Sequence, residues 1–387
     1  MKLVPLAGRT EDAVRNALLS HGWEGDLSRT TADSLELLAY HLTDAEPATL
    51  EALVRTGSRL GVDVITGDDW ALLSGPRARL SALARPWTGP EPLAEFAAAL
   101  GHALPSDDPR SWHTARGPVS LEQPVIIGIL NLTPDSFSDG GRHAAVATAL
   151  ARAATLLEGG ARAIDVGGES TRPGAVPVSV DEELTRVIPL ITTLARRLPE
   201  ALISIDTTKA AVAGAALDAG AAIVNDVSGL RHDPALAELC AERRAGVILM
   251  HSRGAPGELT ASQQYPGGVL VEVATELAQA VTRARRGGIP ADALVVDPGL
   301  GFGKTPEESI ELLSGLGTLR VLGRPLLVGP SRKRFLGALT DRPVEQRDVA
   351  TAAACALAWE AGARLFRVHE PALTRDALRV ARAIRPR

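Results

Sequence analysis

Aromatic residues are scarce in this 387-residue chain, at 3% of the sequence, and it contains only two cysteines. Cys240 and Cys355 stand far apart within segments of helical pattern, so we expect two reduced core thiols. No apolar run is long enough to span a bilayer, and the opening residues, MKLVPLAGRTEDAV, lack the apolar region of a secretory signal. These absences favour a cytoplasmic protein with no membrane partner.

An excess of positive charge is also absent. The net charge is −5 and the pI is about 6.0, whereas non-specific nucleic-acid binding requires a basic face. We therefore expect no nucleic-acid partner, and any anion site must come from a local group of cations. Apolar residues, by contrast, make up 45% of the chain, which is enough for a sizeable core.

The composition changes near residue 104. Residues 104–123 are rich in proline and polar residues and have no clear periodicity, which is typical of a linker. Residues 1–103 contain short helical and strand-like patterns but no catalytic group of side chains, so we predict a small N-terminal α/β domain of unknown role. Residues 124–387 then form a second, catalytic domain.

In the second domain, aliphatic runs alternate with amphipathic segments rich in alanine and leucine. The runs begin near Val125, Ala163, Leu202, Ala222, Gly246, Ala293, Pro325 and Arg364. Their near-continuous hydrophobicity suits parallel strands covered on both faces. Eight strand–helix units in about 260 residues match a (β/α)8 TIM barrel, an α/β fold. A doubly wound open sheet is the alternative, although it seldom needs eight such regular units.

Polar side chains stand where the aliphatic runs stop. They include Asn131, Asp206, Asn225, His251, Asp297, Lys333, Arg367 and His369. In a TIM barrel these strand ends meet at the C-terminal mouth, where active sites lie. Buried polar groups without partners are costly, so we expect these side chains to satisfy one another or a ligand.

The carboxylates and the amide suggest the first part of that ligand. Asp206, Asn225 and Asp297 can read the edge of a flat heterocycle that presents adjacent N–H and amino donors. The sequence therefore predicts a polar heterocycle across the barrel mouth.

The cationic residues suggest the second part. Lys333, Arg367 and His369 follow the seventh and eighth strands, where barrels of this class often bind phosphate. The segment GILNLTPDSFSDGG at 128–141 carries Asn131 with acidic and hydroxyl groups, the oxygen ligands that Mg²⁺ on a diphosphate requires. We expect an anionic leaving group on this side of the mouth.

Several other polar residues have a structural interpretation. His251 is either a hydrogen-bonded core histidine or a substrate contact, and Lys304 is interpreted as a surface lysine at a helix start. Asp165 and Asp226 are expected to hold loops and strand neighbours, and Glu169 to order its own loop.

Six motifs together resemble the dihydropteroate synthase family. They are GILNLTPDSFSDGG at 128–141, GGESTRPGA at 167–175, IDTTKAAVAGAALDAGAAIVNDVSG at 205–229, DPGLGFGKT at 297–305, GPSRKRFLG at 329–337 and RVH at 367–369. The resemblance covers the chain from about residue 124 to its end, and the N-terminal part is similar to an extension on some bacterial members. It implies a folate-biosynthesis transferase that condenses 6-hydroxymethyl-7,8-dihydropterin diphosphate with 4-aminobenzoate, releasing 7,8-dihydropteroate and diphosphate.

The resemblance also implies roles for the matching residues. The pterin contacts would be Asp206, Asn225, Met250, Asp297, Lys333 and Arg367; the 4-aminobenzoate contacts would be Thr171, Arg172, Pro173, Phe302 and Arg334. The diphosphate would be held by Asn131, Arg367 and His369, with Asn131 also at the Mg²⁺ ion, and the catalytic group would be Asn131, Lys333, Arg367 and His369. Loops 133–141 and 169–175 would close over the substrates. Family members are usually homodimers and sulfonamide targets.

The chain departs from the family's common pattern in the fifth loop and after Lys333. Ser252 and Arg253 replace a common Met-Gln pair, and Arg334 replaces a serine of some members. One alternative is a methyltetrahydrofolate–corrinoid methyltransferase, which would not need the STRPG, SRK and RVH groups. The other is a non-catalytic pterin-binding paralogue, which we would expect to have lost residues of the proposed catalytic group; all four are present.

Overall fold

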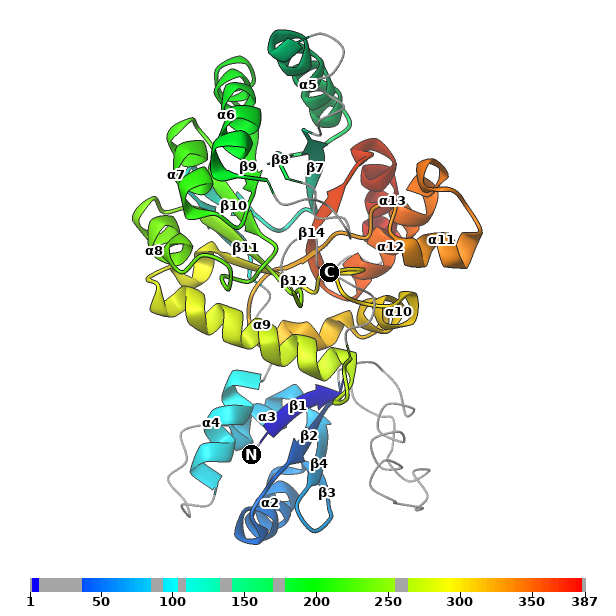
Figure 1. Cartoon of the computed structure of the whole chain (residues 1–387). Helices are drawn as coiled ribbons and strands as arrows, with labels where there is room; N and C mark the ends of the chain where they lie inside the picture. Colours follow the sequence, from blue (N-terminus) through cyan, green and yellow to red (C-terminus); the bar gives the residue numbers. More distant parts are fainter. Residues whose placement is uncertain are drawn as a thin grey trace. The chain divides into compact units, whose positions relative to one another are not determined.

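The computed structural model describes residues 2–6, 37–84, 93–103, 109–132, 141–169, 178–254 and 264–384. The chain divides into two compact units (Figure 1), which we describe separately. The first comprises residues 1–107 with 317–323, and the second comprises residues 108–316 and 324–387. Among the described residues, no helix has the length and apolar character needed to cross a membrane.

The first unit contains a four-stranded antiparallel sheet in the order β1-β2-β4-β3. Its elements are β1 Lys2–Leu6, β2 Leu37–Thr43, α2 Pro47–Leu60, β3 Asp63–Thr66, β4 Ala71–Pro76, α3 Arg77–Leu83 and α4 Ala94–Ala103. Tyr40, Leu53, Leu73 and Phe96 are buried in its core. The α/β character predicted for this part is confirmed, although the sequence pattern does not predict β1, β4 or α4.

Part of the predicted linker is folded. β5 Ser111–Thr114 pairs with β6 Gly117–Ser120 in an antiparallel hairpin. Trp112 is fully buried in a cluster with the first residues of several barrel strands, and its Nε1 donates a hydrogen bond to the Ala293 carbonyl at 2.9 Å. The linker prediction is therefore wrong for residues 111–120. Strands of four residues are too short to give a periodic signal.

The second unit is a closed barrel of eight parallel strands (Figure 1). The strands are β7 Val125–Asn131, β8 Ala163–Gly167, β9 Leu202–Asp206, β10 Ile223–Asp226, β11 Gly246–Met250, β12 Leu294–Asp297, β13 Leu326–Val328 and β14 Ala363–Val368. The helices are α5 Gly141–Glu158, α6 Val180–Arg197, α7 Ala210–Asp218, α8 Ala235–Glu242, α9 Val269–Arg286, α10 Pro306–Ser314, α11 Arg334–Thr340, α12 Asp348–Glu360 and α13 Pro371–Ile384. Because β14 pairs with β7, the TIM barrel is confirmed and the open sheet is wrong.

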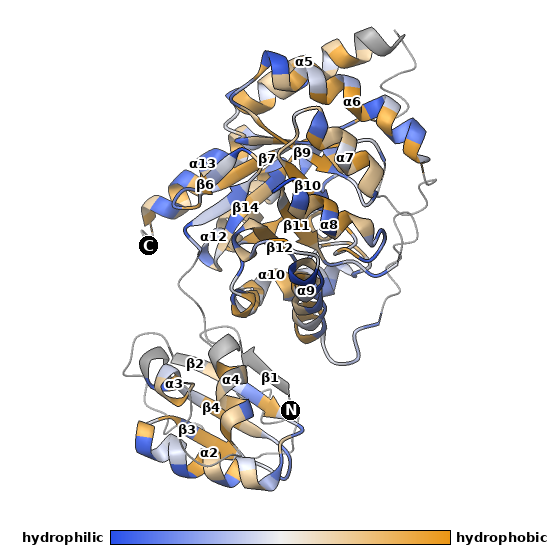
Figure 2. Ribbon diagram, turned by 90° about the vertical axis from the view of Figure 1, so that its left-hand side faces the viewer, coloured by the Kyte–Doolittle hydropathy of each residue, from blue (hydrophilic) through white to orange (hydrophobic). Residues whose placement is uncertain are grey.

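Local sequence accounts for these elements. Most barrel strands are buried along their whole length, as expected for parallel strands under a layer of helices. Figure 2 shows β7 and β9 mostly in the hydrophobic colour, whereas the surrounding helices carry both colours. Helix α10 starts with a capping box between Thr305 and Glu308, with Pro306 in the first turn.

The register of the strands brings the predicted polar residues to one level. Asn131 is the partner of Gly167, Gly167 of Asp206, and Asp206 of Asn225, across β7 to β10. On the next two strands, Met250 pairs with Asp297. These positions all lie at the C-terminal ends of their strands, which is the rim where a TIM barrel places its active site.

Candidate active site

Four of the predicted pterin contacts are buried at this rim: Asp206, Asn225, Met250 and Asp297. Arg367, from β14, joins them through two ion pairs. Its Nε donates to Asp165 Oδ2 at 2.6 Å and its Nη2 donates to Asp206 Oδ2 at 2.7 Å. Asn225 Nδ2 donates to the same Asp165 oxygen at 3.0 Å. Asp165 thus holds two site residues at once, in agreement with its structural interpretation.

Burial shifts the pKa values of two carboxyl groups at the rim, Asp206 and Asp297. Burial raises the pKa of Asp206 to about 7, against the opposing effect of Arg367. Burial likewise raises the pKa of Asp297 to about 6, opposed by the Gly299 N–H and by Lys333, Arg367 and Lys304. A carboxylate that has lost its water gains most from a ligand that donates hydrogen bonds to it. Both groups are therefore suited to the donor edge of a heterocycle.

Lys333 stands beside this pair after β13. Its Nζ lies 3.7 Å from the centroid of the Phe302 ring. Burial and the charge of Arg367 lower the pKa of Lys333 to about 8, and Asp297 and Asp206 act in the opposite direction. The side chain passes close to Gly301, whose φ of +73° and whose missing Cβ, 3.3 Å from Lys333 Cδ, both favour glycine. Lys333, Asp206, Asp297 and Arg367 therefore form one charged group.

His369 follows β14 and contacts Ser331 through its backbone and its ring. Ser331 Oγ accepts a hydrogen bond from the His369 backbone N–H at 3.0 Å and lies 2.8 Å from His369 Nδ1. In the tautomer whose Nδ1 accepts the Ser331 hydroxyl proton, Nε2 carries the ring proton. Burial and the nearby Arg332 and Arg367 lower the pKa of His369 to about 4, so the ring is a neutral donor near pH 7.

The remaining predicted residues are only partly described. Asn131 is exposed at the end of β7, and Arg334 is exposed as the first residue of α11. Thr171, Arg172 and Pro173 lie outside the described residues, as do positions 133–140.

Glu169 connects the two sides of the segment that contains Thr171. Its Oε1 accepts the Val178 N–H at 2.9 Å, and its Oε2 pairs with Lys209 Nζ at 2.5 Å. Lys209 also pairs at 2.6 Å with the fully buried Glu183. Glu169 therefore ties residues 169 and 178 together at the barrel rim, in agreement with the interpretation that it orders its loop.

The interpretation of Lys304 as a surface lysine is wrong. The side chain is 4% exposed and its Nζ lies 2.9 Å from His251 Nδ1. His251, also buried, bonds to Glu276 through Nε2 at 3.1 Å, which favours its interpretation as a core histidine. A lysine just before a helix has no sequence pattern that distinguishes burial from exposure, and the only signal was its place in the motif DPGLGFGKT.

Comparison with known proteins agrees with this geometry. The family model described as pterin binding enzyme matches residues 127–369. A dihydropteroate synthase from Synechocystis is 45% identical over 260 residues, which cover 67% of this chain and 89% of the relative. A Xanthomonas albilineans dihydropteroate synthase solved with 4-aminobenzoic acid is 43% identical with a TM-score of 0.67, covering 72% of this chain and 99% of that one. The same enzyme in complex with 7,8-dihydropteroate matches with 40% identity, a TM-score of 0.64 and the same coverage.

The rim residues, the order of the motifs and the extent of these matches lead to one assignment. The chain belongs to the dihydropteroate synthase family of pterin-binding enzymes.

Proposed function

We propose that this protein condenses 6-hydroxymethyl-7,8-dihydropterin diphosphate with 4-aminobenzoate, releasing 7,8-dihydropteroate and diphosphate. The observation that carries the proposal is the single charged group formed by Asp206, Asp297, Lys333 and Arg367 at the barrel mouth. Relatives support it, since two solved structures of the family hold 4-aminobenzoic acid and 7,8-dihydropteroate. By the same argument the protein is a proposed sulfonamide target, because a Yersinia pestis relative was solved with a sulfonamide drug.

The pterin ring lies on the buried floor. Asp297 accepts hydrogen bonds from the ring's amino and imino donors, with Asp206 and Asn225 completing that end. Met250 lines the pocket, Lys333 reaches the ring carbonyl, and Arg367 packs over the ring. Near pH 7, Asp297, with a pKa of about 6, is mainly an ionised acceptor, and Lys333, with a pKa of about 8, is mainly a charged donor.

The reaction exchanges one bond at the pterin methylene. The C–O bond to diphosphate breaks first, the diphosphate leaves with the electron pair, and the amine nitrogen of 4-aminobenzoate then forms the C–N bond and loses a proton. A free aniline nitrogen is already a nucleophile, so no strong general base is required. The protein's task is to stabilise the charge on the leaving group, which Arg367 and the neutral Nε2–H donor of His369 can do.

A Mg²⁺ ion fits the donor set at this side of the mouth. Mg²⁺ is usually bound by one or two protein oxygens together with substrate phosphates and water. The described residues contain no group of three or more His, Cys, Asp or Glu that could hold a metal alone, but Asn131 ends β7 with an exposed side-chain amide. Asn131 would hold the ion, which when bound neutralises diphosphate charge as a Lewis acid.

Turnover by the full-length protein tests the proposed function. Incubation with both substrates and Mg²⁺ should yield 7,8-dihydropteroate and diphosphate in equal amounts, and chelation of the metal should slow the reaction. If neither product forms when Mg²⁺ is present, the proposed reaction is wrong. Binding of the pterin without turnover would favour the non-catalytic paralogue.

Oligomeric state gives a separate prediction. Helix α12 packs against α13, and both expose large apolar side chains, including Val349 at 74%, Leu357 at 67% and Val380 at 59%. We propose that a second copy covers this face in a homodimer, as apolar surface of this kind marks an interface. Leu357→Glu should shift the mass measured by light scattering from dimer to monomer, while Ile310→Glu on α10 leaves it unchanged. A wild-type mass equal to one chain would contradict the dimer.

The proposed location is the cytoplasm. Cys240 and Cys355 are free and buried, which supports a reducing compartment.

A further inference from the structure

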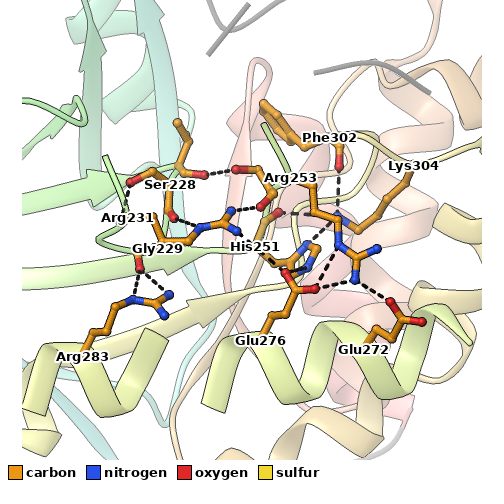
Figure 3. Close-up of polar contacts among 12 residues, drawn as sticks. Ser228, Gly229, Arg231, His251, Arg253, Glu272, Glu276, Arg283, Phe302 and Lys304 are labelled. Carbon is orange, nitrogen blue, oxygen red and sulfur yellow. Dashed lines mark hydrogen bonds and ion pairs between the residues drawn. The ribbon is translucent and has the colours of Figure 1, made fainter. Parts of the chain in front are cut away.

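Lys304 makes more contacts than the proposed function requires of it. Only four of the 41 cationic residues are lysines, and this one is buried behind the rim. Its Nζ donates to the Gly299 carbonyl at 3.0 Å. It also donates to the Phe302 carbonyl at 3.0 Å and meets His251 Nδ1 at 2.9 Å, with a longer contact of 3.4 Å to the His251 carbonyl (Figure 3). These acceptors surround a single nitrogen, which suits the compact, rotatable donors of an ammonium group and not the planar fork of a guanidinium.

The partners of Lys304 have defined protonation states. Burial lowers the pKa of His251 to about 4, so the ring is neutral. Since Nδ1 faces the ammonium, Nε2 carries the proton and donates it to Glu276 at 3.1 Å. Burial lowers the pKa of Lys304 to about 7, and Asp297 and Glu276 oppose this shift while Lys333 and Arg253 add to it. The acceptors around Nζ favour the charged form of Lys304.

Arg253 extends this chain of contacts to helix α9. It bonds to Glu276 and Glu272 of α9, and its guanidinium lies 4.1 Å from the centroid of the Tyr265 ring. Figure 3 shows Arg253 between the two glutamates, with Glu276 also facing His251. Arg253, one of the residues at which this chain departs from the common family pattern, therefore holds the carboxylate that orients His251.

The segment that Lys304 holds is the one that carries the site. The Gly299 N–H donates to Asp297 Oδ1 at 2.7 Å, and the Phe302 ring lies under Lys333 Nζ. Gly299 has φ +66°, and a Cβ there would stand 2.0 Å from the His251 carbonyl oxygen, so the segment lies directly against the end of β11. One ammonium thus fixes the carbonyls of the two residues that orient Asp297 and Lys333.

We propose that Lys304, seated on His251, is a positioning residue that holds residues 299–302 in the geometry both substrates need. The proposal rests on the function proposed above. Lys304 touches neither substrate; it acts through Gly299 on the pterin carboxylate and through Phe302 on the aromatic wall of the 4-aminobenzoate pocket. Losing it should weaken binding in the folded protein. A displacement of about 1 Å can cost an active site about a hundredfold in rate, and we expect the contacts that bind the substrates to be as sensitive to position.

The test is Lys304→Met, which keeps an unbranched side chain close to the length of the lysine stem and removes the donors. Titration of 6-hydroxymethyl-7,8-dihydropterin should give a Kd raised by about 10- to 100-fold. The pH at which affinity is half lost should also rise, because Asp297 loses one neighbouring cation and keeps Lys333 and Arg367.

Arg324→Met serves as a control. Arg324 is half-buried and donates to the Ala291 carbonyl ahead of β12, at the opposite end of that strand from Asp297. This variant should lower Tm while the pterin Kd and its pH midpoint stay at wild-type values.

A second pair of variants tests the same proposal in case Lys304→Met does not fold. His251→Asn keeps a side-chain acceptor for the ammonium, whereas His251→Leu removes it, so only the leucine variant should show the raised Kd and shifted midpoint. Folded Lys304→Met with wild-type Kd and midpoint, or equal behaviour of the two His251 variants, would overturn the proposal. Absence of pterin binding by the wild type would instead overturn the proposed function.

Discussion

Replacing Lys333 with alanine is expected to reduce pterin affinity by about a thousandfold, which corresponds to about 4 kcal/mol. Lys333 lies within the charged group of Asp206, Asp297 and Arg367, and its loss leaves the two buried carboxyls with one cation fewer. Removing one partner of a buried, hydrogen-bonded charged contact with a ligand typically costs about 2–5 kcal/mol of binding free energy. The measurement is calorimetric titration of 6-hydroxymethyl-7,8-dihydropterin into the folded variant.

Asn131→Ala provides the contrast for Lys333→Ala. Asn131 is exposed at the end of β7, and its proposed partners are the diphosphate and its metal ion. The variant should keep the affinity for the diphosphate-free pterin and lose turnover. Equal pterin affinity in the wild type and in Lys333→Ala would show that Lys333 does not contact the ring.

Asp297→Asn is expected to have opposite effects on binding and on stability. The amide oxygen can still accept the Gly299 N–H, but the side chain no longer offers a carboxylate to the ring's donors. We expect kcat/KM to fall by about a thousandfold, a loss of about 4 kcal/mol in transition-state stabilisation. At pH 8 the substrate-free variant should be more stable than the wild type by about 3 kcal/mol, because it buries no carboxylate at this position.

The pH dependence of this effect follows from the raised pKa of Asp297. Its folded value is about 6, against 3.8 for the free group, so between these values the folded state binds more protons than the unfolded state. This carboxyl therefore lowers wild-type stability as pH rises from about 4 to about 6, and the asparagine variant lacks that decrease. Chemical denaturation at pH 4 and pH 8 measures the difference. A variant less stable than the wild type at both values would contradict the assignment of a desolvated carboxylate.

Binding should show the reverse trend with pH. The pterin needs the ionised form of Asp297, so wild-type affinity should fall as pH drops below about 6. An affinity that is constant from pH 5 to pH 8 would mean that Asp297 does not accept the ring's donors.

The barrel and the residues at its rim could be predicted from the sequence for a physical reason. Parallel strands under a helix layer are apolar throughout, so the residue that ends each run, such as Asp206 or Asp297, marks the strand's C-terminal end. In a closed barrel these strand ends share one rim. Predicting the barrel therefore also predicts that these residues lie close together. The register of Asp206 with Asn225, and of Met250 with Asp297, confirms that reasoning.

Features that depend on packing between segments far apart in the chain could not be predicted from the sequence pattern. Trp112 is buried against residues as far along the chain as Ala293, and its short strands carry too few residues for a pattern. A deletion designed to isolate the barrel should therefore keep the hairpin of residues 111–120. The burial of Lys304 could not be predicted because its acceptors are brought together only by the fold. Two are backbone carbonyls of its own loop, and the others belong to His251 at another strand end.

The most direct measurement is a crystal structure of the protein with 6-hydroxymethyl-7,8-dihydropterin bound. We expect the ring inside the barrel mouth, its amino edge within hydrogen-bonding distance of the Asp297 carboxylate and its hydroxymethyl group pointing toward Asn131 and His369. A pterin bound outside the mouth, or inside it with that edge turned away from Asp297, would contradict the site described for this chain.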